Sequence, residues 1–554
     1  MNFKIKHTLA ILLIVLAGAC KKDFLDRTPL NIISEKSVWA DKSLSEAYLY
    51  TIYNYMPCGY GAYYVKGTAL TGGTLVTDGG FGITDLLDGS TDLLRSPSVW
   101  NESNSIMIPG LVSATYNPHN TWGRSYEVIR KVNNLLNGLS TSKLDDEWKA
   151  RVTAEARFVR AFQYFDLARR YGNVPLITRL QPFDNMDSIL VAQTPQAQVY
   201  AYVDAELSTI ADQLPTAANL PASELGRATR EAAWALNGRN LLYAKNYARS
   251  AEFSKKVMDG NAFTLNASYQ NLFQSHGGDK EVIFEILFDG VNKGHCYDAL
   301  MLPHAFVTGW GAQTNPTQEL VDSYEMTNGK YITDPASGYN AQDPYKDRDK
   351  RFYASILYNG ATLKGKTLDM LYPAGMDAPL QPDRTISGYY PRKFIDESAA
   401  NGIVFGESKT SWKELRLGEV LLNYAEAKNQ ADGATSEVYA ALQLIRDRAG
   451  LPALPAGLSK DDMQTRIMQE RKVELAFEGH RFWDLRRWKI AETTLNGKYF
   501  HGMMVTPGPG NTLTYSPYEI SYLPKQVFQA RNYLMPIPQA EIEKNKNLHQ
   551  NDGY

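Results

Sequence analysis

Residues 470–488 read ERKVELAFEGHRFWDLRRW and interleave charged with bulky apolar side chains in a way that a solvated helix does not need. Arg471, Glu474 and Glu478 are spaced by three and four residues, which places all three on one helical face. Gly479 is a natural helix stop, and we expect a second short helix after it. The segment therefore predicts a partly buried lattice of arginine–carboxylate pairs, which holds helices in register and need not take part in catalysis.

Helical periodicity covers much of the remaining chain. The segment 151–178 carries two apolar stripes, one of Phe158, Phe162 and Phe165 and the other of Tyr164, Leu167 and Tyr171. A helix that is apolar on two sides is packed on two sides. Residues 231–246 and 247–259 form two helices joined at a tight turn, a pattern similar to a degenerate tetratricopeptide (TPR) unit. Further helices are expected at 41–56, 122–171, 198–213 and 415–448.

Residues 1–19 have the pattern of a secretory signal and are excluded from the fold. Lys4 and Lys6 precede the apolar run LAILLIVLA, which is too short to span a bilayer as a helix. Small residues then lead to Cys20, as in a bacterial lipobox, where the cysteine is lipidated (palmitate) and becomes the mature N-terminus. Several acyl chains anchor a protein far better than one, because each buried CH₂ group adds about 0.8 kcal/mol.

The composition excludes some classes of protein. With 44% hydrophobic and 21% charged residues, the 554-residue chain is typical of a globular protein. Its net charge of −2 becomes more negative when Lys4 and Lys6 are removed, which argues against nucleic-acid or anionic-membrane binding. Cys58 and Cys296 do not make a disulfide framework, and the sequence leaves open whether they pair.

Two regions depart from the helical pattern. Residues 57–120 are rich in Gly, Ser, Asn and Asp with scattered aromatic residues. Long irregular segments in compact proteins are usually functional or disordered, and the aromatic content argues against disorder. Residues 260–412 are mixed: 281–288 (EVIFEILF) predicts a strand, and 289–312 is again rich in Gly and aromatic residues.

Six blocks, taken in order, resemble the SusD/RagB family over nearly the whole mature chain. They are the lipobox followed by DFLD (23–26), the segment RVTAEARFVRAFQYFDLARRYGNVPLIT (151–178), DPYKDRDKRF (343–352), WKELRLGEVLLNYAEAKNQ (412–430), the opening stretch, and YLMPIP (533–538) with QNDGY (550–554). One block could arise by chance, but six in the family's order are highly specific.

The resemblance implies a mainly α fold, a body of residues 20–554 with about four TPR-like helix pairs and a loop-rich half with short strands. It divides this body near residue 200 into an N-terminal part and a part that carries ligand loops and the C-terminal helices. It also implies a surface-exposed lipoprotein, anchored in the outer membrane through Cys20, which delivers oligosaccharide to a SusC-like TonB-dependent transporter. No enzymatic activity and no cofactor are expected of this family.

The matched blocks are scaffold, so the loops must choose the ligand. Flat aromatic rings offer apolar area at low entropic cost, and sugar rings present C–H faces that can lie on them. By position, 57–120 and 289–312 correspond to the regions that carry glycan-binding aromatics in SusD-like proteins. The candidate ligand residues are Trp100, Asn101, Trp310, Tyr297, Tyr64, Phe81, Asp85 and Arg95, with Trp100 and Trp310 foremost.

The sequence offers little evidence for a catalytic or metal site. Glu419 and Glu426 share a helical face, but the arginines around them favour structural ion pairs over the carboxylate pair of a glycosidase. The eight histidines form no HxH or HExxH motif, and the acids of 84–92 lack the spacing of a calcium loop. No GxSxG motif or phosphate-binding loop is present. We therefore predict no catalytic residue and no metal site.

Several functions remain to be distinguished. A peptide-capturing, RagB-like lipoprotein would have a wide polar trench, whereas an oligosaccharide-binding one would have a shallow arc of aromatic rings. A lipid-anchored glycosidase would need a cleft with two carboxylates whose pKa values differ. A purely structural TPR adaptor would have a grooved helical face and no small-molecule site.

Overall fold

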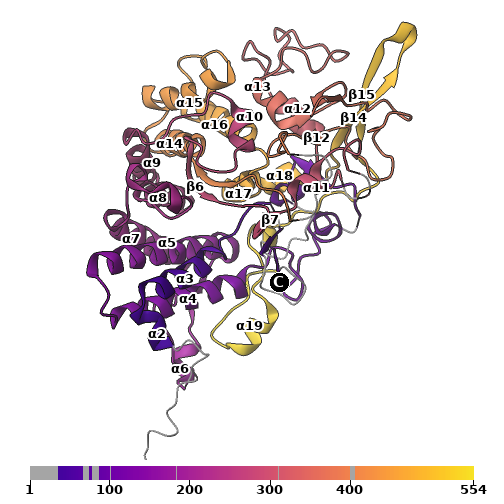
Figure 1. Cartoon of the computed structure of the whole chain (residues 1–554). Coiled ribbons are helices and arrows are strands. Elements are labelled where there is room, and N and C mark those ends of the chain that lie inside the picture. Colours follow the sequence, from indigo (N-terminus) through magenta and orange to yellow (C-terminus); the bar gives the residue numbers. More distant parts are fainter. Residues whose placement is uncertain are drawn as a thin grey trace, which may run out of the picture.

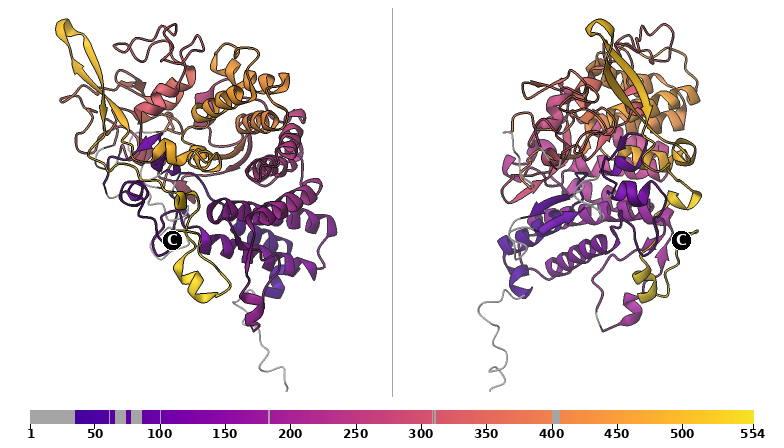
Figure 2. Two further views of the ribbon diagram at one scale, coloured as in Figure 1. Left: turned by 180° about the vertical axis from the view of Figure 1, so that it is seen from behind. Right: turned by 90° about the vertical axis from the view of Figure 1, so that its right-hand side faces the viewer.

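The computed structural model describes residues 35–60, 62–65, 74–77, 86–99, 101–182, 184–307, 309, 311–399 and 406–554 of the chain. Figure 1 shows two halves, a column of helices on the left and a loop-rich half with short strands on the right. The view from behind in Figure 2 shows the same division, with a long yellow hairpin projecting from the loop-rich half. The fold is mainly α, as the sequence predicts.

The helical column follows the chain from the bottom of Figure 1 to the top. Its first helices are α2 (Glu35–Ala40), α3 (Lys42–Tyr53), α4 (Trp122–Ser140), α5 (Asp146–Tyr171), α6 (Met186–Ile189), α7 (Gln196–Ile210), α8 (Arg230–Tyr243) and α9 (Tyr247–Asp259). Its last are α14 (Leu417–Asp432), α15 (Ser436–Ala449), α16 (Lys460–Glu474), α17 (His480–Arg487) and α18 (Ala491–Leu495). Successive helices pack on one another: α4 on α5, α5 on α7, α7 on α8, α8 on α9, and α9 on α14. The assignment of these pairs to the TPR class, and the division of the chain near residue 200, stay predictions.

Helix α5 lies in the middle of the column and is enclosed on both sides. Phe158, Phe162, Phe165, Tyr164 and Tyr171 are all fully buried, as the two apolar stripes predict. The helix begins at Asp145, whose side chain accepts a hydrogen bond from the backbone N–H of Trp148, and ends at Gly172.

The loop-rich half is held together by short antiparallel strand pairs. The pairs are β1 (Ala62–Val65) with β2 (Thr74–Thr77) and β7 (Lys293–His295), β3 (Leu94–Arg95) with β8 (Asn315–Pro316), β6 (Val282–Ile286) with β13 (Trp412–Arg416), β9 (Ile356–Leu357) with β12 (Tyr390–Pro391), β10 (Thr362–Leu363) with β11 (Lys366–Thr367), and β4 (Val174–Pro175) with β5 (Gln193–Thr194). The predicted strand at 281–288 is β6. Short helices complete this half: α10 (Tyr269–Gln274), α11 (Tyr297–Met301), α12 (Gln318–Ser323), α13 (Lys350–Ser355) and α19 (Gln539–Lys544).

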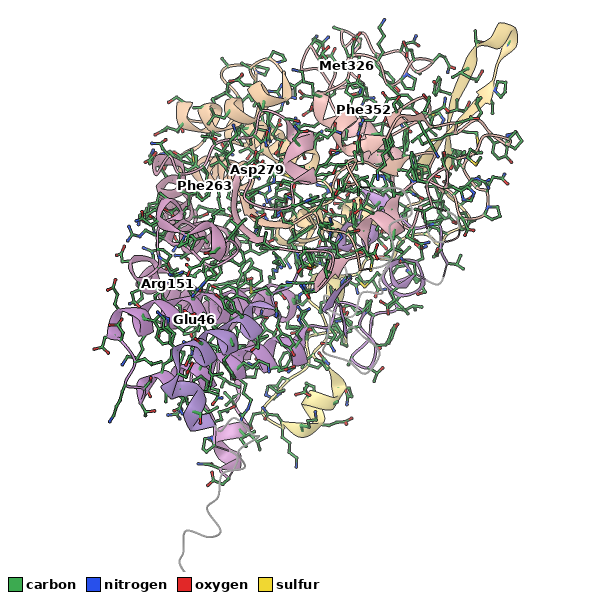
Figure 3. All side chains as sticks on the ribbon, viewed as in Figure 1. Glu46, Arg151, Phe263, Asp279, Met326 and Phe352 are labelled. Atoms are coloured by element: carbon green, nitrogen blue, oxygen red, sulfur yellow. The ribbon has the colours of Figure 1, made fainter. Side chains whose placement is uncertain are left out.

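The projecting hairpin consists of β14 (His501–Pro507) and β15 (Leu513–Glu519). Its outer part is fastened to the body by Gln342, whose side-chain amide bonds both the N–H and the carbonyl of Tyr515, at 3.1 Å each. Figure 3 shows side chains filling both halves, with Glu46 and Arg151 among the lower helices and Met326 and Phe352 in the upper loop-rich part. None of the helices in the described ranges is long and apolar enough to cross a membrane.

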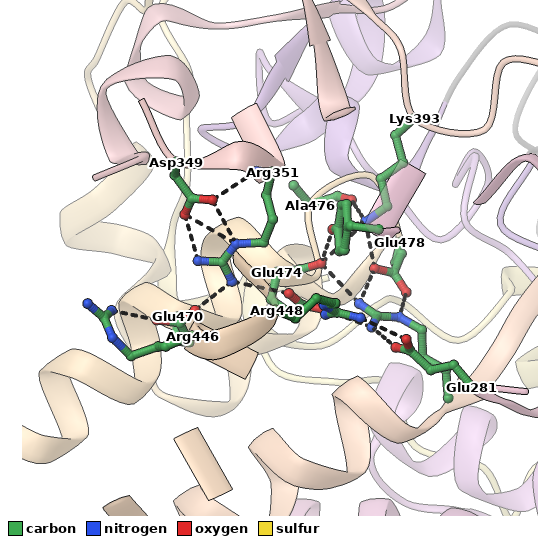
Figure 4. Close-up of polar contacts among 12 residues, drawn as sticks. Glu281, Asp349, Arg351, Lys393, Arg446, Arg448, Glu470, Glu474, Ala476 and Glu478 are labelled. Carbon is green, nitrogen blue, oxygen red and sulfur yellow. Dashed lines mark hydrogen bonds and ion pairs between the residues drawn. The ribbon is translucent and has the colours of Figure 1, made fainter. Parts of the chain in front are cut away.

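The predicted arginine–carboxylate lattice is confirmed, and it is larger than the opening stretch suggests. We define the ion-pair core as the connected ion pairs of Glu281, Asp349, Arg351, Lys393, Arg416, Arg446, Arg448, Glu470, Glu474 and Glu478. Figure 4 labels all of these residues except Arg416 and marks polar contacts among them. None of these side chains is more than 6% exposed. Five are cations and five are carboxylates, so the charges of this set balance, and Arg446 also contacts the buried Glu325 at 2.9 Å.

Arg416 lies at the centre of the ion-pair core. Its guanidinium contacts Glu281 at 2.9 Å, Glu474 at 2.8 Å and Glu478 at 2.7 Å. Gly418 makes this approach possible, because a Cβ atom at that position would lie 2.2 Å from an Arg416 nitrogen. The core therefore joins β6, β13, α15 and α16, which come from distant parts of the chain.

The local prediction at 470–488 needs one correction. Helix α16 ends at Glu474, five residues before Gly479, so Glu478 lies in the following turn and not on the same helical face. Phe477 and Gly479 both have a positive φ, at 69° and 76°, and this reverses the chain before α17. Glu474 and Glu478 still reach Arg416 together, because the turn folds back over β13.

Candidate ligand-binding site

The β3–β8 pair brings the two predicted ligand loops together. Leu94 pairs with Pro316 and Arg95 with Asn315 in antiparallel register. In an antiparallel pair, the residues that follow one strand lie beside those that precede the other. The segments 96–99 and 311–314 are therefore neighbours, although more than 200 residues separate them along the chain.

Direct hydrogen bonds join the walls around this junction. The Ser98 hydroxyl donates to Oε1 of Gln313 at 3.0 Å, and the Tyr522 hydroxyl donates to the carbonyl of Pro97 at 2.8 Å. On the other side, the backbone N–H of Ile386 donates to Oδ1 of Asn315 at 2.9 Å. Four segments that are distant in sequence thus form one connected frame.

A hollow of about 680 Å³ opens within this frame. Its volume lies within the range of about 300–1,000 Å³ that is usual for small-ligand sites. The lining residues are Pro97, Ser98, Val99, Gly311, Gln313, Leu380, Gln381, Pro382, Asp383, Arg384, Thr385, Ile386 and Tyr522. The hollow, as defined by these residues, is the candidate ligand-binding site.

Apolar side chains are unusually exposed at the hollow. Val99 is 64% exposed, Leu380 45% and Tyr522 51%. Single exposed apolar residues are ordinary, but several around one concave surface indicate a binding site. The exposed ring, the apolar neighbours and the polar edge together suit a ligand with both C–H faces and hydroxyl groups.

The wall at 380–386 is a compact closed loop. The N–H of Leu380 donates to the carbonyl of Thr385 at 3.0 Å, and the Thr385 hydroxyl accepts bonds from three backbone N–H groups that follow it. Leu380 and Asp383 both have a positive φ, at 62° and 56°, which is uncommon for residues other than glycine. Such conformations persist where the surroundings hold them, and they recur at ligand sites.

Three of the predicted ligand residues lie in the part of the chain that the structure describes, and the side chains of all three are buried. Arg95 donates to the carbonyl of Leu94 and to Oε1 of Gln526, both at 2.6 Å, so it fixes the segment before the hollow. Asn101 accepts the N–H of Ser103 and begins the helical turn behind the loop. The hydroxyl of Tyr297 donates to the carbonyl of Lys393 at 2.9 Å, and its ring is only 1% exposed. These placements give the three residues a supporting role in the walls, and their contact with ligand stays a prediction.

The other predicted ligand residues lie outside the described residues. This holds for Trp100, Trp310, Phe81 and Asp85 and for the side chain of Tyr64, whose backbone is in β1, and also for the lipidation site Cys20. The described neighbours of Trp100 and Trp310, which are Val99 and Gly311, both line the hollow.

The sequence reasoning missed the two other walls. Tyr522 follows the hairpin near the C-terminus, and residues 380–386 lie in a mixed region with no distinctive pattern. A usable signal was the cluster of turn-forming residues at 373–388, where glycine and proline are frequent. Nothing in the local sequence links either segment to Trp100 or Trp310.

The carboxylates considered for catalysis are ion-paired in the interior. Glu419 contacts Arg239 at 2.6 Å, and Glu426 contacts Arg487 and accepts the indole N–H of Trp488. Burial acts to raise the pKa of Glu419, but Arg239 lowers it overall to about 2. Both residues are structural ion-pair partners, and neither lines the hollow, where Asp383 is the one carboxylate among the described residues.

The described part of the chain also contains no cluster suited to bind a metal and no reactive thiol. Within those ranges no group of three His, Cys, Asp or Glu side chains is arranged to hold a metal. Cys58 and Cys296 are both buried, and they form no disulfide with each other. Burial raises the pKa of the Cys296 thiol to about 12, so it stays protonated and unreactive.

A second hollow of about 820 Å³ lies on the helical half, between the end of α2 and the end of α4. Its aromatic residue is Trp39, which is only 8% exposed because its ring packs against Gly138. The second hollow therefore lacks an open ring face, and it contains no residue of either predicted ligand loop.

Comparisons with known proteins agree with the geometry. A model described as "SusD family" matches residues 280–554, and a model described as "Starch-binding associating with outer membrane" matches residues 88–242. SusD-like protein P2 of Formosa agariphila is 26% identical over 465 residues, covering 80% of this chain and 81% of that protein. The starch-binding protein SusD of Bacteroides thetaiotaomicron is 24% identical over 507 residues, covering 82% of each.

Solved structures share the fold over nearly the whole chain. A SusD-like protein and a SusD-like carbohydrate-binding protein, both from Bacteroides fragilis, each have 27% identity and a TM-score of 0.78. They cover 95% and 93% of this chain, and each is covered completely. A laminarin-binding SusD-like protein has the same fold, with a TM-score of 0.67 at 22% identity.

Proposed function

Since the chain belongs to the SusD/RagB family, we propose that it is a non-catalytic lipoprotein of the outer membrane that captures oligosaccharides in the hollow and passes them to a transporter. The observation that carries the proposal is the β3–β8 junction, which brings both aromatic-rich loops to one concave, partly apolar surface. Relatives described as starch-binding and carbohydrate-binding support oligosaccharide as the ligand class.

The register of β3 and β8 favours Trp100 and Trp310 as ligand contacts. Positions 94 and 95 pair with 316 and 315, and Val99 and Gly311, the described neighbours of the two tryptophans, both line the hollow. The bond between Ser98 and Gln313 shows that the two segments stay adjacent beyond the strands. We propose that Trp100 and Trp310, which lie outside the described residues, contact the ligand.

The anchoring and delivery steps rest on the N-terminal pattern and on the family. The lipobox pattern ending at Cys20 would attach the body to the outer membrane, and the description of the matching N-terminal model mentions outer-membrane association. A SusC-like TonB-dependent barrel is the proposed recipient of the ligand. Surface exposure of the lipoprotein follows from the same proposal, because the ligand must be met outside the barrel.

Two alternatives remain in the proposal. A peptide ligand would use backbone groups along an extended trench, whereas the described hollow is compact and has an exposed ring, which favours sugar. A glycosidase would need a second carboxylate within about 5–10 Å of the first, and the described lining offers Asp383 alone.

The proposal is tested by a binding screen of the chain lacking residues 1–20 against oligosaccharides and peptides of matched length. Calorimetry should detect reversible binding of at least one oligosaccharide and recover it chemically unchanged. Exclusive binding of peptides, or hydrolysis of a bound glycan, would contradict the proposal.

The anchor is tested separately. Cys20→Ser in the full chain should abolish incorporation of labelled palmitate and leave an uncleaved precursor that mass spectrometry can identify. Normal acylation of this variant would show that Cys20 is not the lipidation site.

A further inference from the structure

We propose that the hollow selects uncharged oligosaccharides over polyanionic ones, with the ring of Tyr522 as its fixed stacking face and the Asp383 carboxylate as its acceptor for sugar hydroxyls. The inference rests on the proposed function and adds a ligand class and two residues to it. It depends only on described residues and on the bonds that hold them.

Tyr522 combines exposure with fixation. About half of its side-chain surface is open, while its hydroxyl is committed to the Pro97 carbonyl at 2.8 Å. A ring that is already held in place loses little conformational entropy when a ligand lies against it. Its neighbours Val99 and Leu380 extend the apolar surface, as the C–H face of a pyranose ring requires.

The cation of the hollow is bonded to its own loop. Arg384 donates through Nε to the carbonyl of Met376 at 2.5 Å and through Nη1 to the carbonyl of Pro382 at 3.3 Å. An arginine that recognises a carboxylate or sulfate offers a fork of two parallel N–H groups. Because two donors of this guanidinium point at backbone carbonyls, Arg384 acts as a clasp for its own loop.

The neighbouring carboxylate adds repulsion. Asp383 is exposed, lies next to Arg384 in the lining, and has no hydrogen-bond partner or ion pair among the described residues. A free carboxylate accepts bonds from sugar hydroxyls, which are donors, and opposes a uronate or sulfate group. Asp383 has a positive φ within a loop that the hydrogen bonds of Thr385 hold closed, so its backbone is kept in place by its surroundings.

Discrimination by charge can be measured with two sets of six-unit oligosaccharides. The uncharged set consists of gluco-, xylo- and manno-oligosaccharides, and the charged set consists of hexagalacturonate and a sulfated hexasaccharide. Calorimetry on the chain lacking residues 1–20, at low and moderate salt, should show the best uncharged ligand binding at least about ten-fold more tightly than either anion. Tighter binding of an anion would overturn the inference.

Variants then separate the two residues. Tyr522→Ala should weaken the best uncharged ligand about ten-fold, whereas Tyr522→Phe, which keeps the ring but loses the bond to Pro97, should weaken it about two- to three-fold. Asp383→Lys should reduce uncharged binding and raise the affinity for hexagalacturonate. Tyr50→Ala is the matched control, because Tyr50 is 45% exposed on α3 of the helical half and should not affect either set.

The outcomes distinguish this inference from the proposed function. Binding of uncharged oligosaccharides that is unaffected by Tyr522→Ala and Asp383→Lys, with both variants folded by circular dichroism, would remove these residues from the site and leave oligosaccharide binding standing. An absence of binding by every oligosaccharide in both sets would contradict the proposed function and the inference together.

Discussion

The ion-pair core and the hollow use polar side chains in opposite ways. In the core, Arg416 contacts three carboxylates and is 1% exposed, and every charge has a partner of opposite sign. At the hollow, Asp383 is open to solvent, and the donors of Arg384 bond backbone carbonyls. The charges of the ion-pair core hold distant parts of the chain together, whereas the hollow keeps a carboxylate available for a ligand.

The comparison shows where stability and recognition are located. Buried ion pairs contribute little relative to apolar residues, but removing one partner is costly because the others remain buried and uncompensated. Exposed groups at the hollow can change with small effects on folding. Substitutions in the two regions should therefore separate the free energy of unfolding from ligand affinity.

The largest effect is expected at the centre of the ion-pair core. Arg416→Met leaves Glu281, Glu474 and Glu478 with reduced compensation and should lower the free energy of unfolding by about 3–5 kcal/mol. Urea unfolding followed by circular dichroism measures this change.

A surface pair supplies the control for Arg416→Met. Lys255 contacts Asp259 at 2.9 Å on α9, and both side chains are more than half exposed. Lys255→Met should cost less than about 1 kcal/mol. Equal losses in the two variants would show that the buried lattice has no special part in stability.

Acid should destabilise the core next. Burial acts to raise the pKa of Glu474, but Arg448, Arg416 and Arg351 hold it well below the ordinary value of 4.5. A carboxyl group with a depressed folded-state pKa stabilises the protein fully above its unfolded-state pKa, so this stability is lost as the pH falls below about 4.5.

Urea midpoints at pH 7, 5, 4 and 3.5 test this linkage. The unaltered chain should lose stability steeply between pH 5 and 3.5, and Glu474→Gln should be less stable at pH 7 but less sensitive to acid. Parallel curves for the two proteins would mean that Glu474 does not contribute to the acid response.

The two regions also differ in how far the sequence predicts them. Charged residues that alternate with aromatic ones, such as Arg471, Glu474 and Glu478, predict internal ion pairs. This lattice was confirmed, even though the helix ends at Glu474. Of the hollow, the sequence indicated only the segments around Trp100 and Trp310, and these two residues lie outside the described part of the chain. Tyr522 reaches the wall at 97–99 through a single hydrogen bond to Pro97, a tertiary contact with no local sequence signal.

Asp92 connects the two regions and should affect both measurements. It contacts Arg481 at 2.8 Å and Lys472 at 3.1 Å, and it precedes β3 and the wall at 97–99. Asp92→Asn leaves two cations under-compensated and should cost about 1–3 kcal/mol of stability. Because weaker contacts of residue 92 with Arg481 and Lys472 would let the wall at 97–99 move, ligand affinity should fall as well.

The Asp92 variant is informative in comparison with Arg416→Met. Affinity measured at a temperature where both variants are folded should fall in Asp92→Asn and change less in Arg416→Met, since Arg416 does not hold the wall. A loss of affinity that follows stability alone in both variants would indicate that the core and the hollow are not separate.

Trp100→Ala and Trp310→Ala should each weaken oligosaccharide binding several-fold without unfolding the chain. The physical reason is the loss of a flat apolar ring on which the C–H face of a sugar is proposed to lie. Calorimetry measures affinity, and thermal unfolding supplies the check on folding. Trp310→Phe keeps a ring and should recover part of the binding, and an unchanged dissociation constant in both alanine variants would remove the two residues from the site.

The smallest effect should come from Ser98→Ala, which removes the 3.0 Å bond between the wall at 97–99 and Gln313. Asn104 still supports the wall by donating to the carbonyls of Ser96 and Ser98, so the loop should loosen without leaving its place. Affinity should fall about two-fold and stability by less than about 1 kcal/mol. Ser140→Ala on α4, where an exposed serine also makes one bond, should change only stability. A ten-fold loss in Ser98→Ala would mean that the hydroxyl itself contacts the ligand, and the frame and the recognition surface would then be the same residues.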